Sequence, residues 1–291
     1  MKKNKKTTNK LSAFLAYTSY QIRSQIMRNR WLLPIVLGVL IGLRNATIMQ
    51  GDPALRIIKS ANVWDVIFST LGSTYFVHLV ILTTFLYLIG DLLPEKNYGQ
   101  LILFRLKSRR QWWLSKILTL LTLTVVYMVL FIAPIVLVGG LSHGWSLDYS
   151  EQTFFNRFMS GVPANLFAAG TEEAYITPLD LFAQTLLLIF LALFTSGLFA
   201  TVITLFTSRS LFGLIGGFSF VFVSLIGNSL SGPPSWVKFL PSHHVTYLGG
   251  LPVRLIPIPI SVLYWMIWIC LLVSLGFFRS VKQNIFSVAK E

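Results

Sequence analysis

The stretch Ile117–Val138 reads ILTLLTLTVVYMVLFIAPIVLV and contains no charged residue. A bilayer hydrocarbon core about 30 Å thick is crossed by about 20 apolar residues in a helix. The stretch therefore predicts a membrane-spanning helix. Pro134 is compatible with it, because neighbouring helices can satisfy the carbonyl group that a proline frees.

Five further apolar runs surround this stretch. We expect spans over Trp31–Leu43, Thr70–Gly90, Leu181–Phe206, Leu211–Ile226 and Ile260–Phe278. Only 12% of the residues are charged, about half the fraction found in soluble domains. We predict an all-α integral membrane protein in which a single domain of six transmembrane helices covers 31–278. A long outer loop is expected at about 139–178, and cytoplasmic segments at 1–30 and 279–291.

The distribution of Lys and Arg residues orients these spans. With the N-terminus inside, 18 of the 24 Lys and Arg residues fall on inner segments and six on outer ones. Such an excess marks the cytoplasmic side. We expect a multi-pass protein of a bacterial plasma membrane with both termini in the cytoplasm. The net charge of +14 follows from this topology, and the absence of a base-reading basic helix argues against a nucleic-acid partner.

Residues 11–30 have the pattern of an amphipathic helix that lies on the membrane. Their apolar side chains, Leu11, Phe14, Leu15, Ile22 and Ile26, share one helical face. Arg residues on its flanks would reach lipid headgroups. Thr18 and Gln25 interrupt the apolar face. We predict an N-terminal interfacial helix that contacts membrane lipid.

The sequence carries no catalytic motif. It lacks the phosphate loop G-x-x-x-x-G-K-[ST] and the zinc motif H-E-x-x-H. Its single cysteine, Cys270, can form neither an internal disulfide nor a cysteine metal cluster. We therefore expect no enzyme activity, metal or cofactor in this chain, and any ATP-driven process would need another subunit.

Three features within the predicted spans and loops allow two interpretations each. His78 lies in mid-span, either as a neutral histidine bonded to a neighbouring helix or on a substrate path. Gly213 and Gly217 form a G-x-x-x-G that suits close packing within the chain or a dimer seam. His243 and His244 are adjacent in an outer proline-rich loop, where adjacent side chains point apart and no carboxylate motif accompanies them, so a metal site is the less favoured interpretation.

The loop between the second and third spans is the most informative segment. It begins at Asp91, and six positive residues lie within it or at its edge, the last of them Lys116. Pro94 can start a short helix, whose first turn would suit Glu95. The segment is either a basic loop that reaches into headgroups or a helix that docks a cytoplasmic protein. The residues expected on such a docking helix are Glu95, Gly99, Leu101, Leu103, Arg105, Ser108 and Arg109.

At this loop the chain resembles the permease subunits of type-2 ABC exporters. In that family an acidic residue, a glycine, apolar residues, a Ser-Arg-type motif and a lysine follow in this order, as Glu95, Gly99, Leu101, Leu103, Ser108-Arg109 and Lys116 do here. The resemblance implies a coupling helix in contact with an ATP-binding subunit. It also implies a segment that folds back into the membrane before the last span, which Pro233–Pro259 would form. The 40-residue outer loop is longer than in many members.

The resemblance implies a subunit that moves an apolar or amphipathic cargo, such as a peptide, lipid or drug, out of the cytoplasm. Its partners would be separate ATPase subunits, which bind ATP and Mg, and a second copy or a sister permease. The alternative is a membrane-embedded sensor or interaction protein without transport. A membrane enzyme would have to use the outer acids Asp148, Glu151, Glu172 and Glu173, which also fit a solvated surface.

Overall fold

The computed structural model describes residues 3–49, 61–73, 75–93, 108–150, 177–229, 239–245 and 257–282. Every regular element within these residues is helical. The elements are α1 (Lys3–Ile26), η1 (Asn29–Leu32), α2 (Leu33–Met49), α3 (Val63–Leu71), η3 (Phe76–Leu82), α4 (Thr83–Ile89), α6 (Arg109–His143), α8 (Pro178–Thr207), α9 (Ser210–Ser229), α10 (Ser242–Val245) and α11 (Ile258–Lys282).

Four helical stretches are long and apolar enough to cross a membrane. They are Asn29–Met49, Arg109–His143, Pro178–Thr207 and Ile258–Lys282. A fifth candidate is the pair Val63–Leu71 and Phe76–Ile89, if the two helices form one span. The chain is therefore an all-α, multi-pass membrane protein with four to five candidate spans by helix length and hydropathy, and the six expected spans are not all reproduced.

The second expected span is broken rather than continuous. The helices on either side of the break are inclined by 83°. Gly72 ends α3, where its N–H bonds to the carbonyls of Phe68 and Thr70. The chain resumes with η3, a π-helix, and passes into α4. Hydropathy does not detect this bend because the residues at the break, 72–75, carry no charge.

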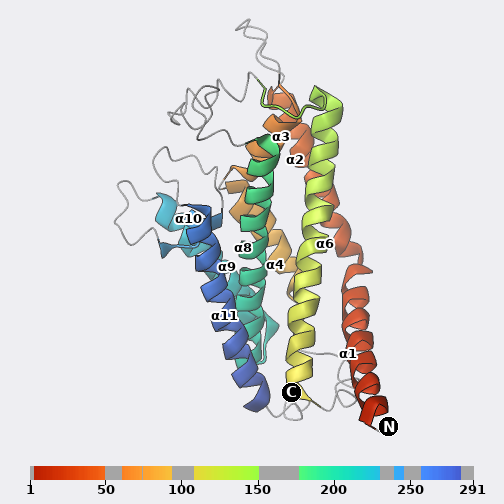
Figure 1. The fold of residues 1–291 in the computed structure, drawn as a ribbon. Coiled ribbons are helices and arrows are strands. Elements are labelled where there is room, and N and C mark those ends of the chain that lie inside the picture. The colour runs from red at the N-terminus through yellow and green to blue at the C-terminus, as the bar shows by residue number, and fades with distance from the viewer. Residues whose placement is uncertain are drawn as a thin grey trace, which may run out of the picture.

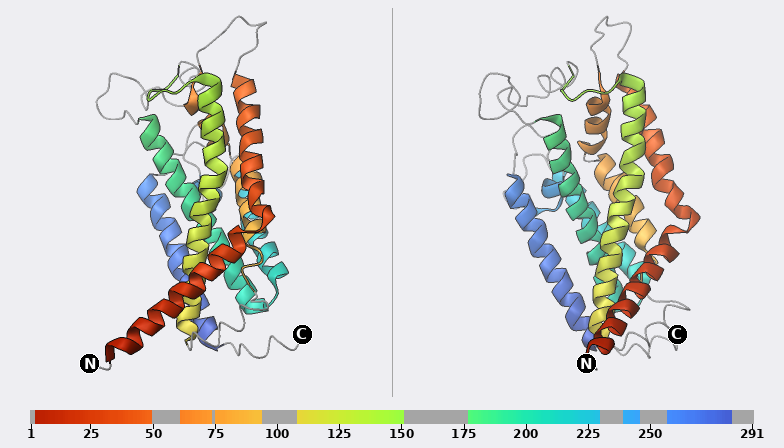
Figure 2. Two further views of the ribbon diagram at one scale, coloured as in Figure 1. Left: turned by 90° about the vertical axis from the view of Figure 1, so that its right-hand side faces the viewer. Right: turned by 45° about the vertical axis from the view of Figure 1, so that its right-hand side comes forward.

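The long helices run side by side, with α8 between α11 and α6 (Figure 1). α8 is the most enclosed of the four long helices. Of its 18 most apolar consecutive residues 72% are buried, against 17% for α11. α1 is inclined to the other helices and crosses the start of α6 (Figure 2). We call the end of the bundle at which α1 and the last turn of α11 lie the inner end, following the orientation predicted from Lys and Arg.

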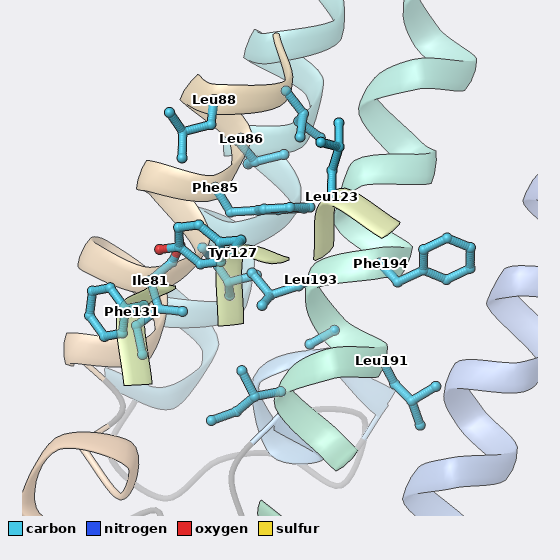
Figure 3. Close-up of a cluster of buried hydrophobic side chains, with 14 of the residues drawn as sticks. Ile81, Phe85, Leu86, Leu88, Leu123, Tyr127, Phe131, Leu191, Leu193 and Phe194 are labelled. Atoms are coloured by element: carbon cyan, nitrogen blue, oxygen red, sulfur yellow. The ribbon is translucent and has the colours of Figure 1, made fainter. Parts of the chain in front are cut away.

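An aromatic and aliphatic cluster between α4, α6 and α8 forms the centre of the bundle (Figure 3). Phe85 and Tyr127 are fully buried, with ring centroids 5.3 Å apart. The Tyr127 hydroxyl donates to the carbonyl of Ile81 at 2.8 Å. This bond satisfies a buried phenol and joins α6 to the π-helical segment, whose irregular backbone needs such partners inside a membrane.

Glycines on α2 allow it to approach α6 closely. A Cβ atom at Gly38 would lie 2.5 Å from the carbonyl oxygen of Phe131, and one at Gly42 would lie 3.1 Å from Cβ of Val138. These two glycines form a G-x-x-x-G, a spacing that places small residues on one face for helix contact. The same spacing occurs at Gly213 and Gly217, the pair from which the sequence predicts a helix contact.

Gly213 and Gly217 face α8 and α4 of the same chain. A Cβ at Gly213 would meet the Thr204 hydroxyl and the Ala200 carbonyl of α8, and one at Gly217 would lie 3.0 Å from a Leu86 methyl. The tight connection before α9 fits this packing, because Ser208 takes a left-handed conformation with φ of 60°. The G-x-x-x-G therefore has a packing partner within the chain.

Large apolar side chains cover the outer surface of the bundle. On α11, Leu263, Ile267 and Leu271 are each more than 45% exposed, and α2 and α6 present similar rows. A water-soluble protein seldom exposes contiguous apolar area on this scale. Such surfaces are what lipid chains or a second membrane chain would cover.

Candidate functional site

The predicted site residues fall in two groups. Ser108, Arg109, His78, Gly213 and Gly217 lie in the described residues. The others, Glu95, Gly99, Leu101, Leu103 and Arg105, belong to 94–107, outside the described residues. Both flanks of that segment are described, and each is fastened to the inner end of the bundle.

Asp91 fastens the flank that follows α4. Its Oδ2 atom accepts from Nη1 of Arg28 at 2.6 Å and from Nη1 of Arg30 at 2.9 Å. Arg30 also donates to Oε1 of Gln25 at 2.7 Å. Arg28 has an extended backbone between α1 and η1, so one carboxylate joins the α1–α2 hinge to the end of α4. The sequence places Asp91 at the start of the loop, but its arginine partners are more than 60 residues away.

Lys116 holds the next part of the same flank. Its side chain is only 2% exposed, and Nζ donates to the carbonyl oxygen of Leu92 at 3.0 Å. An ammonium group is costly to bury without polar partners. The bond of Lys116 to Leu92 therefore connects α6 to the backbone just after α4.

Arg109 fastens the other flank. Ser108 is the N-cap of α6 but makes no side-chain cap bond. Arg109 Nη1 donates to the carbonyl oxygen of Val281 at 2.6 Å. One turn further on, Trp113 Nε1 donates to the carbonyl of Val273 at 3.1 Å. Ser108 and Arg109 therefore lie at the start of the α6 span and not on a separate surface helix, because α6 begins eight residues before the apolar run.

A polar seam joins α1 to α6. The hydroxyls of Thr18 and Ser115 lie 2.8 Å apart, and Thr119 donates to Oε1 of Gln21 at 3.1 Å. Thr18, Gln21 and Gln25 are all buried. The polar residues that interrupt the apolar face therefore lie against α6, whereas Leu15 is 52% exposed. Buried side chains of this kind need hydrogen-bond partners, which α6 supplies.

His78 lies in the middle of η3 and is buried, with 1% of its surface exposed. Its carbonyl accepts from the Thr83 hydroxyl at 3.1 Å. π-Helical turns often mark functional positions.

A polar pair joins α2 to the neighbouring α3, where Asn45 Nδ2 donates to Oγ1 of Thr70 at 2.6 Å.

His243 and His244 show no metal geometry. The His244 ring stacks on Tyr264 with centroids 4.0 Å apart, and Nδ1 lies 3.1 Å from the Ser261 hydroxyl. Across the described residues, no three His, Cys, Asp or Glu side chains are grouped in a way that could hold a metal ion.

The opposite end of the bundle contains a buried carboxylate. Asp65 is 5% exposed. Its Oδ2 accepts from the Asn62 N–H at 2.8 Å and from the Ser150 hydroxyl at 2.6 Å. Asn62 in turn accepts from the Trp64 N–H, which completes a capping box at the start of α3. Asp65 precedes the second expected span, and the structure places it in the first turn of a helix that packs against α6.

We expect Asp65→Ala to lower the unfolding free energy by about 1–3 kcal/mol, because it removes a cap and leaves a buried hydroxyl and N–H without an acceptor. Thermal unfolding in detergent measures this loss. Asp180→Ala is the matched control, since Asp180 lies in the first turn of α8 and accepts from Thr177, but in an exposed setting. An equal loss for both variants would contradict a special role for burial at Asp65.

At the inner end, hydrogen bonds join both flanks of 94–107 to neighbouring elements of the bundle. One carboxylate, one buried lysine and one arginine fasten the two flanks of 94–107 to the α1–α2 hinge, α6 and α11. A force on that segment would reach three elements of the bundle through direct hydrogen bonds.

Two comparisons, one with curated proteins and one with solved structures, found no match. A family model does match, over residues 34–286, and its description is "Protein of unknown function (DUF2705)". That match runs from the start of α2 to beyond α11 and includes both flanks of 94–107. The chain belongs to this DUF2705 family.

Proposed function

We propose that the chain is the membrane-spanning subunit of an ATP-driven exporter of the type-2 ABC class, with ATP hydrolysed by separate subunits. The observation that carries the proposal is the anchoring of 94–107 at both flanks, by Asp91 and Lys116 on one side and Arg109 on the other. A segment that receives force from an ATPase must be held by the helices that it moves. The acidic, glycine, apolar and basic residues between these anchors supply the docking surface.

The six-span topology of such a subunit is part of the proposal. In it the bent α3–α4 unit is the second span and α9 the fifth. α9 is an apolar helix of 20 residues, and Gly217 lets it pack on Leu86 of α4. α10 would belong to the segment that folds back into the membrane. Its contacts with α8, α9 and α11 support this, as does the burial of His244.

The cargo in this proposal is apolar or amphipathic. The described helices expose Leu, Ile, Val and Phe side chains in quantity, and buried threonines of α6 and α8 donate to backbone carbonyls of their own helices. His78 and the π-helical η3 lie beside the bend of the broken span, which makes this the place where we expect the cargo path. A second copy or a sister permease would complete the path.

The test is affinity purification in mild detergent followed by identification of co-purified chains. We expect an ATP-binding chain with the unaltered protein, and at least about tenfold less of it with the double variant Glu95→Ala/Arg105→Ala, because hot-spot contacts dominate docking. Arg109→Ala alone removes the bond to Val281. It therefore tests the anchoring of the segment to α11 separately from the docking of the ATPase. Arg23→Ala, on the exposed face of α1, is the matched control and should retain the partner.

A chain that purifies alone from native membranes at every detergent strength would contradict the exporter assignment. That outcome would favour the alternative of a membrane-embedded sensor or interaction protein. Retention of the ATPase by the Glu95→Ala/Arg105→Ala variant would contradict the assignment of the docking segment, while leaving the exporter itself in place.

A further inference from the structure

Positive side chains gather at the inner end of α11. Arg279 and Lys282 belong to its last two turns. Arg109 reaches the carbonyl of Val281, and Cζ of Arg110 lies 5.4 Å from the ring centroid of Phe277. Arg209 follows on the exposed connection between α8 and α9. A helix C-terminus favours a positive charge, but one or two groups would meet that need.

These cations are held by aromatic rings and carbonyl groups. Cζ of Arg279 lies 5.3 Å from the ring centroid of Phe206, and its buried Nε has no hydrogen-bond partner. Within the described ranges, both ion pairs are made by Asp91, with Arg28 and Arg30. Among the described residues, the side chains of Arg209 and Arg279 make no hydrogen bond, and a guanidinium has five N–H donors with which to bind an external anion.

An exposed apolar stripe leads along α11 to the cluster. Leu263, Ile267, Leu271, Leu275 and Phe278 follow at intervals of three or four residues and are 60%, 58%, 46%, 42% and 65% exposed. Such spacing puts them on one face of the helix. One surface therefore presents cations at the inner end and a mainly apolar row that runs from them along α11.

We propose that this surface binds an anionic phospholipid, with the phosphate of its headgroup at Arg279 and Arg209 and its acyl chains along the α11 stripe. The charges fit the headgroup, and the direction of the stripe fits the acyl chains. Arg side chains are suited to phosphate because their planar fork donates in pairs. This site is separate from the proposed ATPase docking and does not rest on it.

Cys270 offers a direct reporter of this lipid. It is the only cysteine of the chain and is exposed on α11, about 13 Å from Arg279 by helical rise. The chain is labelled there with a fluorophore and reconstituted in phosphatidylcholine vesicles. A fixed fraction of the lipid is then replaced by phosphatidylglycerol or by phosphatidylcholine, each brominated in mid-chain. Fluorescence quenching reports which lipid lies against α11.

We expect a relative affinity for phosphatidylglycerol about fivefold above that for phosphatidylcholine, as one well-placed basic residue provides at a membrane surface. The preference should fall to about one in Arg209→Gln/Arg279→Gln and remain in Arg23→Gln, which removes an inner-end charge from α1. Because the readout is a ratio between two lipids, a general change in folding does not imitate it. Arg209→Gln alone, at an exposed turn, should lower the preference without touching the Phe206 contact.

Three results would overturn the proposal. Equal quenching by both lipids would show no headgroup selection. Quenching by neither lipid would show that a protein, such as a second copy of this chain, covers the stripe. Loss of the preference when millimolar glycerol phosphate is added would show that the cluster binds soluble phosphate instead of a lipid.

Discussion

Replacing Gly38 with valine is expected to reduce the unfolding free energy of the chain by about 2–3 kcal/mol, the cost of forced overpacking. The reason is the contact of α2 with the backbone of α6. A Cβ at Gly38 would lie 2.5 Å from the Phe131 carbonyl oxygen and 3.3 Å from Cβ of Pro134. Neither atom belongs to the far end of a flexible side chain, so the two helices would have to separate.

Thermal unfolding in detergent measures this effect, with Val36→Leu as the matched control. Val36 lies on α2 two residues earlier and is 51% exposed, so an added methylene there meets only the surroundings. We expect a clear fall in Tm for Gly38→Val and no change for Val36→Leu. A Gly38→Val variant as stable as the unaltered chain would contradict the close α2–α6 approach.

In the proposed exporter, replacing Asp91 with alanine is expected to reduce ATP turnover by at least about fivefold, the lower range of typical coupling energies. The variant would free Arg28 and Arg30 together and so disconnect the α1–α2 hinge from the end of α4. The Asp91 side chain is 49% exposed, and ion pairs exposed to this degree contribute little stability. We therefore expect a loss of coupling with almost unchanged Tm.

The measurement is ATP hydrolysis by the purified complex in lipid nanodiscs. Arg28→Ala/Arg30→Ala should reproduce the loss, because it breaks the same contacts from the other side. Asp180→Ala, an exposed carboxylate near the opposite end, should leave turnover unchanged. Full turnover in Asp91→Ala would show that the hinge connection carries no coupling, and a large fall in Tm would assign Asp91 to folding alone.

Apolar length predicts the long helices of this protein well. The expected spans at Trp31–Leu43, Ile117–Val138, Leu181–Phe206 and Ile260–Phe278 all lie within longer helices of the structure. The helices extend beyond these spans, because polar residues such as Arg109 continue a helix past its apolar run. The break at Gly72 escapes the same reasoning, since hydropathy records composition and not backbone direction.

The inner-end linkage is only partly predictable from sequence. Asp91 and Lys116 mark the limits of the basic loop, but their partners are distant in the chain, and only the fold brings them together. The seam of Thr18 and Gln21 with α6 was hidden for a different reason. In the sequence, polar residues within an apolar helical face look like interruptions of a lipid-facing surface. Only the structure shows that a neighbouring helix supplies their hydrogen bonds. For Gly38 and Gly42 the signal was present, because their spacing equals that of Gly213 and Gly217.

The proposed function requires this chain to transmit ATP-driven motion through its inner end. The most direct measurement is the ATP hydrolysis of the chain purified from its native membranes, together with the stoichiometry of the chains that accompany it. We predict one ATP-binding subunit per copy of this chain and vanadate-sensitive hydrolysis that disappears when the two are separated. Purification of the chain without an ATP-binding subunit, or hydrolysis that is unchanged after their separation, would contradict the proposal.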